Sequence, residues 1–454
     1  MSNADGPLCP LEFRYGRPEV RQIFSRDSRL RRALQVEAAL ALTEAELGMV
    51  PAEAARAIAE AAAGGQVTLE RVDALETSLR HDVMAITRAL AEAAGGGGGW
   101  VHYGATSADI TDTALALELQ AAARVLHEDL SALATALLDL AEKHRTTAEV
   151  GRTHGQHAVP LTFGYKMVGA AAEIVRHRTR LGELLPRLAV GKMAGAVGTG
   201  AGFGAHAEAV ESGVMERLGL QADEAPSQIV GRDRIAEFTN FLALVASTSE
   251  RLATEVRNLQ RTEIAEVAEA FDEAKQVGSS TMAQKRNPML SENVTSLARL
   301  VRAFALPPME NMVQWHERDL ANSANERIVL PHAIVLLDDI LTKLTDVFRH
   351  LDVDTARMAA MLASSGGGPM TEALMLALTA KGMPRADAHE LLRRLTRASG
   401  SDEPLLERAK KDSAVRAQFT EAELDAILSP HAYVEAAAAK TDRVIQRLRG
   451  ELSA

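Results

Sequence analysis

The sequence has few cysteines, few aromatic side chains and no long apolar run. Cys9 is the single cysteine among 454 residues, which excludes an intramolecular disulfide framework and fits a reducing compartment. No stretch reaches the roughly 18 consecutive apolar residues that span a bilayer. Asp5 and Arg14 flank the short apolar stretch near the start, which is unlike the apolar core of a signal peptide. We therefore expect a cytoplasmic protein with no membrane partner.

Positive charge is also scarce. The formal net charge is -11 and the isoelectric point lies near 5.7. A broad nucleic-acid surface needs clustered lysines and arginines, so we expect no nucleic-acid partner. A local basic pocket for a small anion stays possible.

Alanine and leucine are abundant, aromatic residues make up only 4%, and charged residues are interspersed, which is the composition of long helices. Two segments without Gly or Pro, from Asp112 to about His144 and from Asp233 to about Ala270, carry apolar stripes at heptad spacing. The stripes consist of Leu126, Leu130, Leu133, Leu137 and Leu140, and of Phe238, Leu242, Val245, Leu252, Val256 and Leu259. Helices of about 50 Å usually bury such stripes in a bundle or a subunit interface. The sequence predicts an all-α protein with little sheet that forms oligomers.

Glycine-rich and proline-containing segments divide the chain. The glycine run 95–99 and the segment Ser364 to Pro369 suggest three domains, which are an N-terminal helical domain (1–110), a central long-helix domain (111–358) and a C-terminal helical domain (359–454). Polar blocks that contain glycine interrupt the helical sequence at 151–160, 191–204 and 276–288. Function usually lies in such interruptions.

Two histidines in the first interruption are candidates for acid–base chemistry. His154 and His157 flank Gly155 and Gln156, and imidazole is the side chain whose usual pKa lies near neutral pH. The alternative is a loop in which both rings only satisfy backbone groups. Further ligands at zinc spacing are lacking, so we expect no metal site.

Weaker signals lie upstream. His81 beside Asp82 fits a helix cap or a hydrogen-bonded pair as well as a catalytic role, and His102 is a lone histidine. Thr106 and Ser107 fit an N-cap of the long helix that follows. The free N–H groups of a helix start also form an anion site, which a substrate carboxylate would fit.

The segment from Gly278 to Pro288 is the most informative block. Its hydroxyls, cations and amide follow a glycine and precede a proline, which suggests either a mobile lid over an anionic ligand or a plain polar loop. Further on, Arg318 and Arg327 suit carboxylate or phosphate recognition, although salt-bridged helix faces have the same pattern.

Five separated blocks, in this order, resemble the fumarase/aspartase superfamily and, within it, the bacterial and archaeal adenylosuccinate lyase family. The superfamily loop reads G-S-S-x-M-P-x-K-x-N-P, and here residues 278–288 read GSSTMAQKRNP. The other blocks are FRYGRPE at 13–19, HYGATS at 102–107, GRTHGQHA at 151–158 and WHERDL at 315–320. The resemblance covers nearly the whole chain.

The resemblance implies a fold, an assembly and a reaction. It implies an all-α homotetramer in which long helices form a central bundle and three subunits build each active site. The implied reaction is β-elimination of fumarate from adenylosuccinate, giving AMP, and from SAICAR, giving AICAR. It requires no metal or organic cofactor.

Residue roles follow from the same resemblance. His154 would be the general acid, oriented by Glu292 and accompanied by His81, and Ser279 would be the base. Lys285, Asn287, Thr106 and Ser107 would stabilise an aci-carboxylate intermediate. The remaining substrate-binding residues would be Arg14, Tyr15, Arg318, Ser323 and Arg327 at the phosphate, Gln228 at the succinyl group, and Asp82, His102 and Ser280.

The loop departs from the family pattern at two positions. Ala283 replaces the superfamily proline, which costs about 0.4–1 kcal/mol of preorganisation, and Gln284 replaces the usual histidine or tyrosine. The alternatives are therefore a related lyase or cycloisomerase that acts on another N-succinyl or carboxymuconate substrate, and a helical oligomer that has lost catalysis. Retention of Ser279, His154, Lys285 and Glu292 favours an active enzyme.

Overall fold

The structure is a computed structural model that describes residues 9–271, 281–282, 284–397 and 403–453. The chain divides into two compact units. Unit 1 comprises Met1–Leu130, His177–Ser249 and Ser296–Thr342, and unit 2 comprises Ser131–Arg176, Glu250–Thr295 and Lys343–Ala454.

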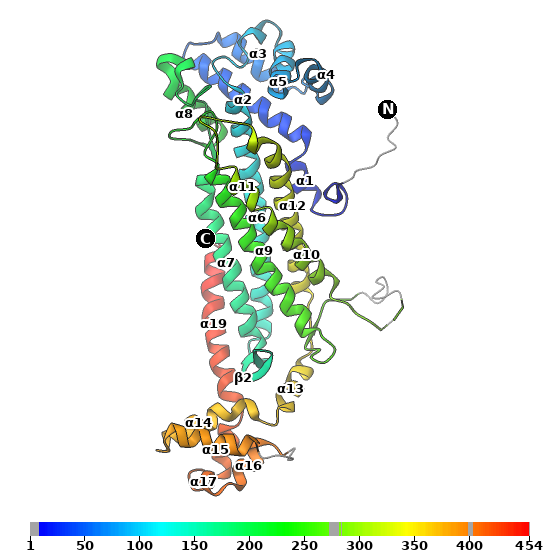
Figure 1. Cartoon of the computed structure of the whole chain (residues 1–454), viewed down its shortest axis with the longest axis vertical. Coiled ribbons are helices and arrows are strands. Elements are labelled where there is room, and N and C mark those ends of the chain that lie inside the picture. The colour runs from blue at the N-terminus through cyan, green and yellow to red at the C-terminus, as the bar shows by residue number, and fades with distance from the viewer. Residues whose placement is uncertain (1–8, 272–280, 283, 398–402, 454) are drawn as a thin grey trace. The chain divides into compact units, whose positions relative to one another are not determined.

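Unit 1 begins with short helices packed around α2 (Figure 1). The hydroxyl oxygens of Ser25 and Thr68 accept backbone N–H groups and cap α2 and α4. Leu34, Ile58 and Leu90 are buried in the shared core. The elements are η1 (Pro10–Glu12), α1 (Pro18–Ile23), α2 (Arg26–Glu46), α3 (Ala52–Ala63), α4 (Leu69–Leu79), α5 (Asp82–Ala93), η3 (Ala201–His206) and α8 (Ala207–Leu218), with the parallel strand pair β3 (Val190–Gly191) and β4 (Gln221–Ala222).

The glycine run is a packed element. It forms the 3-10 helix η2 (Gly95–Trp100), which contacts α3 and α5. A Cβ on Gly97 would lie 2.8 Å from the carbonyl oxygen of Ala54. These glycines therefore allow close backbone packing.

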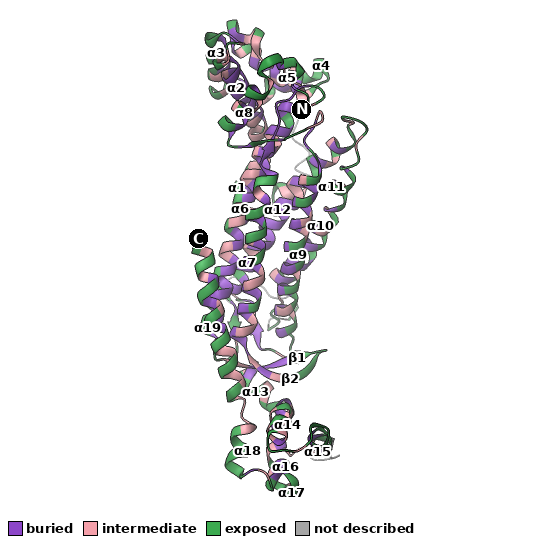
Figure 2. Cartoon of the chain, turned by 90° about the vertical axis from the view of Figure 1, so that its left-hand side faces the viewer, coloured by how far each residue is buried: buried purple, intermediate pink, exposed green. Residues whose placement is uncertain are grey.

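The long helices predicted from the apolar stripes are present. α6 (Ser107–Lys143) has 37 residues, and all five leucines of its predicted stripe are buried. Buried residues also run along α7 (Phe163–Leu188), α9 (Asp233–Leu259) and α12 (Ala321–Arg349) (Figure 2). The all-α prediction is confirmed, and the sheets that the described residues form are three two-stranded pairs.

The second long helix ends eleven residues before the predicted Ala270. After Leu259 the chain turns through Ala265, whose φ is +52°, and the N–H of Glu266 donates to the carbonyl oxygen of Leu259. Strand β5 (Val267–Ala268) then pairs antiparallel with β6 (Asp352–Val353). Strand pairing thus replaces the helical hydrogen bonds that the sequence pattern suggested.

Buried charges fix the helices of unit 1. Arg17 pairs with Asp338 on α12 and with Asp129 on α6. At the start of α6, Asp109 accepts backbone N–H groups from Ala194 at 3.0 Å and Gly195 at 3.1 Å. Asp109 also pairs with Lys192, and neither side chain is exposed.

Unit 2 contains a β-hairpin and the C-terminal helices. β1 (Ala148–Thr153) pairs antiparallel with β2 (Gln156–Thr162), and the hairpin contacts α13 and α19. A separate core, with Leu374, Leu391 and Leu424 buried, joins the smaller helices. The remaining helices are α10 (Met289–Ala303), whose residues belong partly to each unit, α11 (Leu306–Glu310) of unit 1, and α13 (Thr355–Ser364), η4 (Gly368–Met370), α14 (Thr371–Ala380), α15 (Arg385–Arg397), α16 (Leu405–Lys411), α17 (Ser413–Arg416), α18 (Glu421–Ile427) and α19 (His431–Ser453) of unit 2.

A search of the described residues finds no helix with the length and apolar character of a membrane span.

Replacing Asp109 tests the buried anchor of α6. Asp109→Ala leaves Lys192 buried without its carboxylate, which should lower the free energy of unfolding by about 3–5 kcal/mol in urea denaturation. The matched control is Asp27→Ala, because the Asp27 side chain is 47% exposed and forms its ion pair with exposed Arg31. The control should change stability by less than about 1 kcal/mol. An Asp109→Ala loss as small as that of the control would contradict the anchor.

Candidate active site

His154 lies at the tip of the hairpin. His154 and Gly155 connect Thr153 to Gln156, and their φ values are +53° and +73°. Two central residues with positive φ are the requirement of a type I′ turn, in which glycine commonly takes the second place. The His154 side chain is exposed. The block predicted as an interruption of the helical sequence is thus a tight hairpin that presents an imidazole.

Unusual backbone conformations gather at the predicted site blocks. Five described residues other than glycine have positive φ. Four of them lie in or beside these blocks, namely Arg80 (which precedes His81), His102, His154 and His316. Such conformations cost free energy and cluster at functional sites. This agrees with a functional interpretation of these blocks, and His316 adds a residue that the sequence did not single out.

Ion pairs hold the base of the hairpin. Arg152 on β1 donates two hydrogen bonds to Glu266, at 2.7 and 2.9 Å, and the Glu266 side chain is fully buried. Lys166 donates to Glu149 at 2.7 Å and to Glu255 at 2.6 Å. Burial raises the pKa of Glu149 although Lys166 opposes the shift. Arg152, Lys166 and Glu255 also line a groove of about 740 Å³ beside β1 and β2.

The other histidine of the block has a structural partner. His157 on β2 hydrogen-bonds through Nδ1 to the hydroxyl of Ser365, which precedes η4. The sequence left a catalytic and a structural role open for His154 and His157. The partner of His157 favours a structural role for this ring, whereas the exposed ring of His154 stays available for chemistry.

The signature loop is described only in part. Ser279, Ser280 and Ala283 lie outside the described residues. Lys285 is exposed, and Asn287 is half-buried just before α10. Glu292 lies exposed in the first turn of α10. Within the described residues of unit 2, no hydrogen bond or ion pair joins the side chains of His154, Lys285 and Glu292.

His81 and Asp82 start helix α5 in unit 1. Nδ1 of His81 accepts the N–H of Met84 at 3.3 Å, so the ring acts as an N-cap. Arg327 on α12 donates to Asp82 at 2.8 Å. Burial alone would raise the pKa of Asp82, but the N–H of Val83 and the charge of Arg327 outweigh it and lower the pKa. The carboxylate therefore keeps its charge beside an arginine that is 62% exposed.

Gln228 and Arg318 also lie together. Nη1 of Arg318 donates to Oε1 of Gln228 at 3.0 Å, while Nε2 of Gln228 donates to the carbonyl oxygen of Ala196 at 2.8 Å. Nε of Arg318 is buried and has no acceptor among the described residues. Asp319 accepts the N–H groups of Trp315 and Ala321, which fixes the turn that carries Arg318.

His102 is paired with a buried carboxylate. Its Nδ1 lies 2.7 Å from Oε1 of Glu37, which is fully buried. Burial favours the neutral ring, but the hydrogen bond and charge of Glu37 outweigh it and raise the pKa of His102. Burial and the charge of Glu37 raise the pKa of Glu44 to about 8. Glu37 and Glu44 were not predicted as site residues from the sequence. Their only signal there is that two glutamates, seven residues apart, lie on the apolar side of a helix.

The remaining predicted residues take separate positions. Thr106 and Ser107 are half-buried at the start of α6, where the N–H of Thr106 donates to Asp109 at 2.8 Å. Arg14 is exposed, and Ser323 is half-buried in the first turn of α12. Neither of these two makes a side-chain hydrogen bond within the described residues. Tyr15 is half-buried next to Gly16, whose N–H donates to Asp339.

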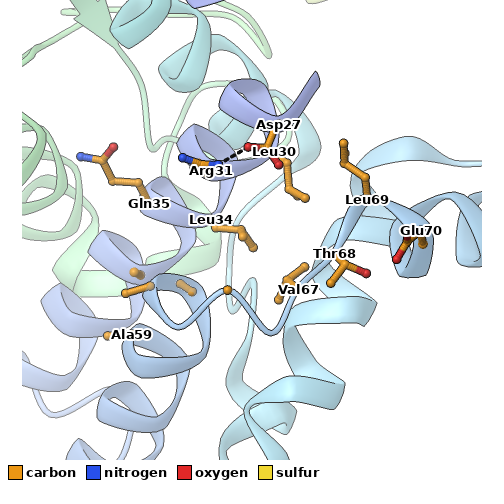
Figure 3. Close-up of a pocket in the computed structure, with 14 residues that line it drawn as sticks. Asp27, Leu30, Arg31, Leu34, Gln35, Ala59, Val67, Thr68, Leu69 and Glu70 are labelled. Carbon is orange, nitrogen blue, oxygen red and sulfur yellow. Dashed lines mark hydrogen bonds and ion pairs between the residues drawn. The ribbon is translucent and has the colours of Figure 1, made fainter. Parts of the chain in front are cut away.

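Two further observations concern ligands. The described residues contain no group of three or more histidine, cysteine, aspartate or glutamate side chains arranged to hold a metal ion. A second pocket, of about 650 Å³, lies beside α2 and α3, with Leu30, Leu34 and Val67 around it and the Asp27–Arg31 ion pair nearby (Figure 3). None of the predicted site residues lines this second pocket.

Comparison with known proteins gives the family. A family model for lyases matches residues 12–303, and a model for the adenylosuccinate lyase C-terminus matches residues 367–444. Adenylosuccinate lyase from Pyrococcus abyssi is 46% identical over 437 residues, which cover 96% of this chain and 97% of the relative. The chain belongs to the adenylosuccinate lyase family. The relative from Methanothermobacter thermautotrophicus is 43% identical, with 97% of this chain and 98% of the relative covered.

Solved structures that resemble this chain include enzymes named for other reactions. The 3-carboxy-cis,cis-muconate lactonizing enzyme from Pseudomonas putida has a TM-score of 0.88 and 32% identity, covering 99% of this chain and all of its own. A fumarate lyase from Mesorhizobium sp. has a TM-score of 0.87 and 30% identity, covering 95% of this chain and 98% of its own. The resemblance inferred from the motifs is confirmed, and the chain is a lyase.

The raised pKa of His102 predicts a pH-dependent stability. Because the folded pKa lies above the usual value of 6.5, the protonated ring stabilises the fold fully below about pH 6.5, and this contribution is lost as pH rises through the folded pKa. His102→Asn should therefore cost more stability at pH 5.5 than at pH 8.5 in urea denaturation. Asparagine tolerates the positive φ of this position, so the difference reports the charge. A loss that is equal at both pH values, or greater at pH 8.5, would contradict the assignment.

Proposed function

We propose that this lyase eliminates fumarate from adenylosuccinate to give AMP, and from SAICAR to give AICAR. The observation that carries the proposal is 46% identity to an adenylosuccinate lyase over almost the full length of both chains. The lyase match to residues 12–303 includes His154 and the signature loop.

The charges of unit 1 support an anionic substrate. Arg318 has a buried Nε without an acceptor among the described residues, which suits a phosphate oxygen. Arg327 is largely exposed beside Asp82. Both arginines belong to a chain whose net charge is -11, so a phosphate would need such local cations in an acidic protein. We assign the phosphate to Arg14, Tyr15, Arg318, Ser323 and Arg327.

The proposed chemistry has two proton transfers. Ser279 removes the β-proton of the succinyl group, and the electron pair moves into the carboxylate to form an aci-carboxylate with two negative charges on its oxygens. Lys285, Asn287 and the N–H groups at Thr106 and Ser107 would stabilise these charges. The pair then returns to form the double bond of fumarate while the carbon–nitrogen bond breaks. His154, oriented by Glu292, gives a proton to the departing nitrogen.

The remaining substrate contacts follow the same assignment. Gln228 would contact the succinyl group, with His81, Asp82, His102 and Ser280 around the substrate. Support comes from the hydrogen bond between Gln228 and Arg318, which brings a proposed succinyl contact next to a proposed phosphate contact.

We further propose a homotetramer in the cytoplasm, with three subunits contributing to each active site. Support comes from apolar side chains that stay exposed in the single chain. Trp315 is 76% exposed, Val313 75% and Leu320 69%, and Leu306 and Ile328 nearby are also exposed. Apolar surface of this extent is typical of protein interfaces. An interface here would also bring a second chain close to the segment that carries Arg318.

The alternative is a carboxymuconate cycloisomerase, since a lactonizing enzyme has the same fold at 32% identity. The arginines described above favour a phosphate-containing substrate instead.

Turnover by the purified protein tests the assignment. Adenylosuccinate should be cleaved to AMP and fumarate, observed as a loss of ultraviolet absorbance, and SAICAR should be cleaved in parallel. Carboxymuconate should show no lactonisation under the same conditions. A folded protein that is inactive on both purine substrates would contradict the purine assignment. Lactonisation of carboxymuconate would favour the alternative.

A further inference from the structure

Helix α10 begins without a cap of its own. The residue before it is Pro288, which has no side-chain acceptor, and the N–H of Met289 donates to the carbonyl oxygen of Asn287. The N–H groups of Leu290 and Ser291 therefore need acceptors from elsewhere in the chain. Ser291 is fully buried, so water does not replace an acceptor at this N–H.

Glu269 supplies both acceptors. Its Oε2 accepts the N–H of Leu290 at 3.1 Å, and its Oε1 accepts the N–H of Ser291 at 2.7 Å. The residue is buried. A carboxylate at a helix N-terminus is also favoured by the helix dipole. Glu269 thus caps a helix that begins twenty residues further along the chain and carries Glu292 in its first turn.

Gln260 makes a second connection. Its Oε1 accepts the N–H of Glu269 at 3.0 Å, and its Nε2 donates to the carbonyl oxygen of Arg286 at 3.2 Å. Arg286 lies between Lys285 and Asn287, the two residues assigned to the aci-carboxylate. One amide side chain therefore joins Glu269 to the segment that stabilises the intermediate.

The segment that holds these two side chains is itself fixed. Glu266 takes both hydrogen bonds of Arg152 from the hairpin, and its N–H and carbonyl oxygen bond to Leu259 and to Asp354. A rigid support is what a charge-stabilising group needs, because preorganised donors stabilise a developing charge without reorganisation during the reaction.

We propose that Gln260 and Glu269 are positioning residues for the elimination, which set Lys285, Asn287 and Glu292 against the substrate through the Arg286 carbonyl and the start of α10. This inference rests on the proposed function. Neither side chain would touch the substrate. They act on the rate of β-proton removal. Lys285 and Asn287 stabilise negative charges that form only as this proton leaves.

The test uses Glu269→Gln and Gln260→Leu in the full chain, with Glu263→Gln as control. Glu263 lies in the turn between Gln260 and Glu266, and its side chain is 75% exposed. Within the described residues, this side chain makes a single long ion pair, with Arg261, which the glutamine variant removes without touching the backbone. Each positioning variant should lose about 10- to 100-fold in kcat and keep KM within about 3-fold. The control should match the wild type. Two independent variants guard against one that fails to fold.

An isotope effect separates positioning from a loss of folded protein. With adenylosuccinate deuterated at the β-carbon, the deuterium effect on kcat should be larger in both variants than in the wild type, because proton removal becomes slower. A smaller amount of active protein would lower kcat and leave this effect unchanged. Variants with near-normal kcat, or with a lower kcat and an unchanged isotope effect, would overturn this inference and leave the proposed function standing. An inactive wild type would overturn the proposed function together with it.

Discussion

The apolar stripes of the long helices must be covered along their length, and this constraint decides where chemistry can lie. The five stripe leucines of α6 are buried, and so is the stripe of α9. Side chains inside such packing are unavailable to a polar substrate. The residues assigned to the reaction therefore lie in the interruptions between helices and in first turns, as His154, Lys285 and Glu292 do. Buried charges such as Asp109 and Glu269 fix these places instead of acting in the reaction.

The described site residues separate by unit. His81, Asp82, His102, Gln228, Arg318 and Arg327 belong to unit 1, and His154, Lys285, Asn287 and Glu292 belong to unit 2. The unit 1 residues are paired within the chain, for instance Asp82 with Arg327 and His102 with Glu37. By contrast, His154, Lys285 and Glu292 are exposed, and in the described part of the chain no ion pair or hydrogen bond joins their side chains. In the proposed assembly, residues from different chains would complete each site.

Local patterns were sufficient for part of this structure. Heptad spacing predicted α6, and the composition predicted an all-α protein, because both depend on neighbouring residues. The hairpin at His154 was predicted only as an interruption of the helical sequence, although a histidine followed by glycine suits a tight turn. Glu269 and Gln260 carried no local signal, since each acts on a segment some twenty residues away. The end of α9 was misplaced because pairing between β5 and β6, which depends on distant sequence, ended the helix.

The proposed assembly requires that chains complete one another's active sites. Its most direct test mixes two inactive variants, His81→Ala from unit 1 and His154→Ala from unit 2, after reversible dissociation and reassembly. Random mixing of equal amounts should restore roughly a quarter of the wild-type turnover of adenylosuccinate, because that share of sites receives an intact His81 and an intact His154 from different chains. A reassembled mixture as inactive as its components would contradict the account.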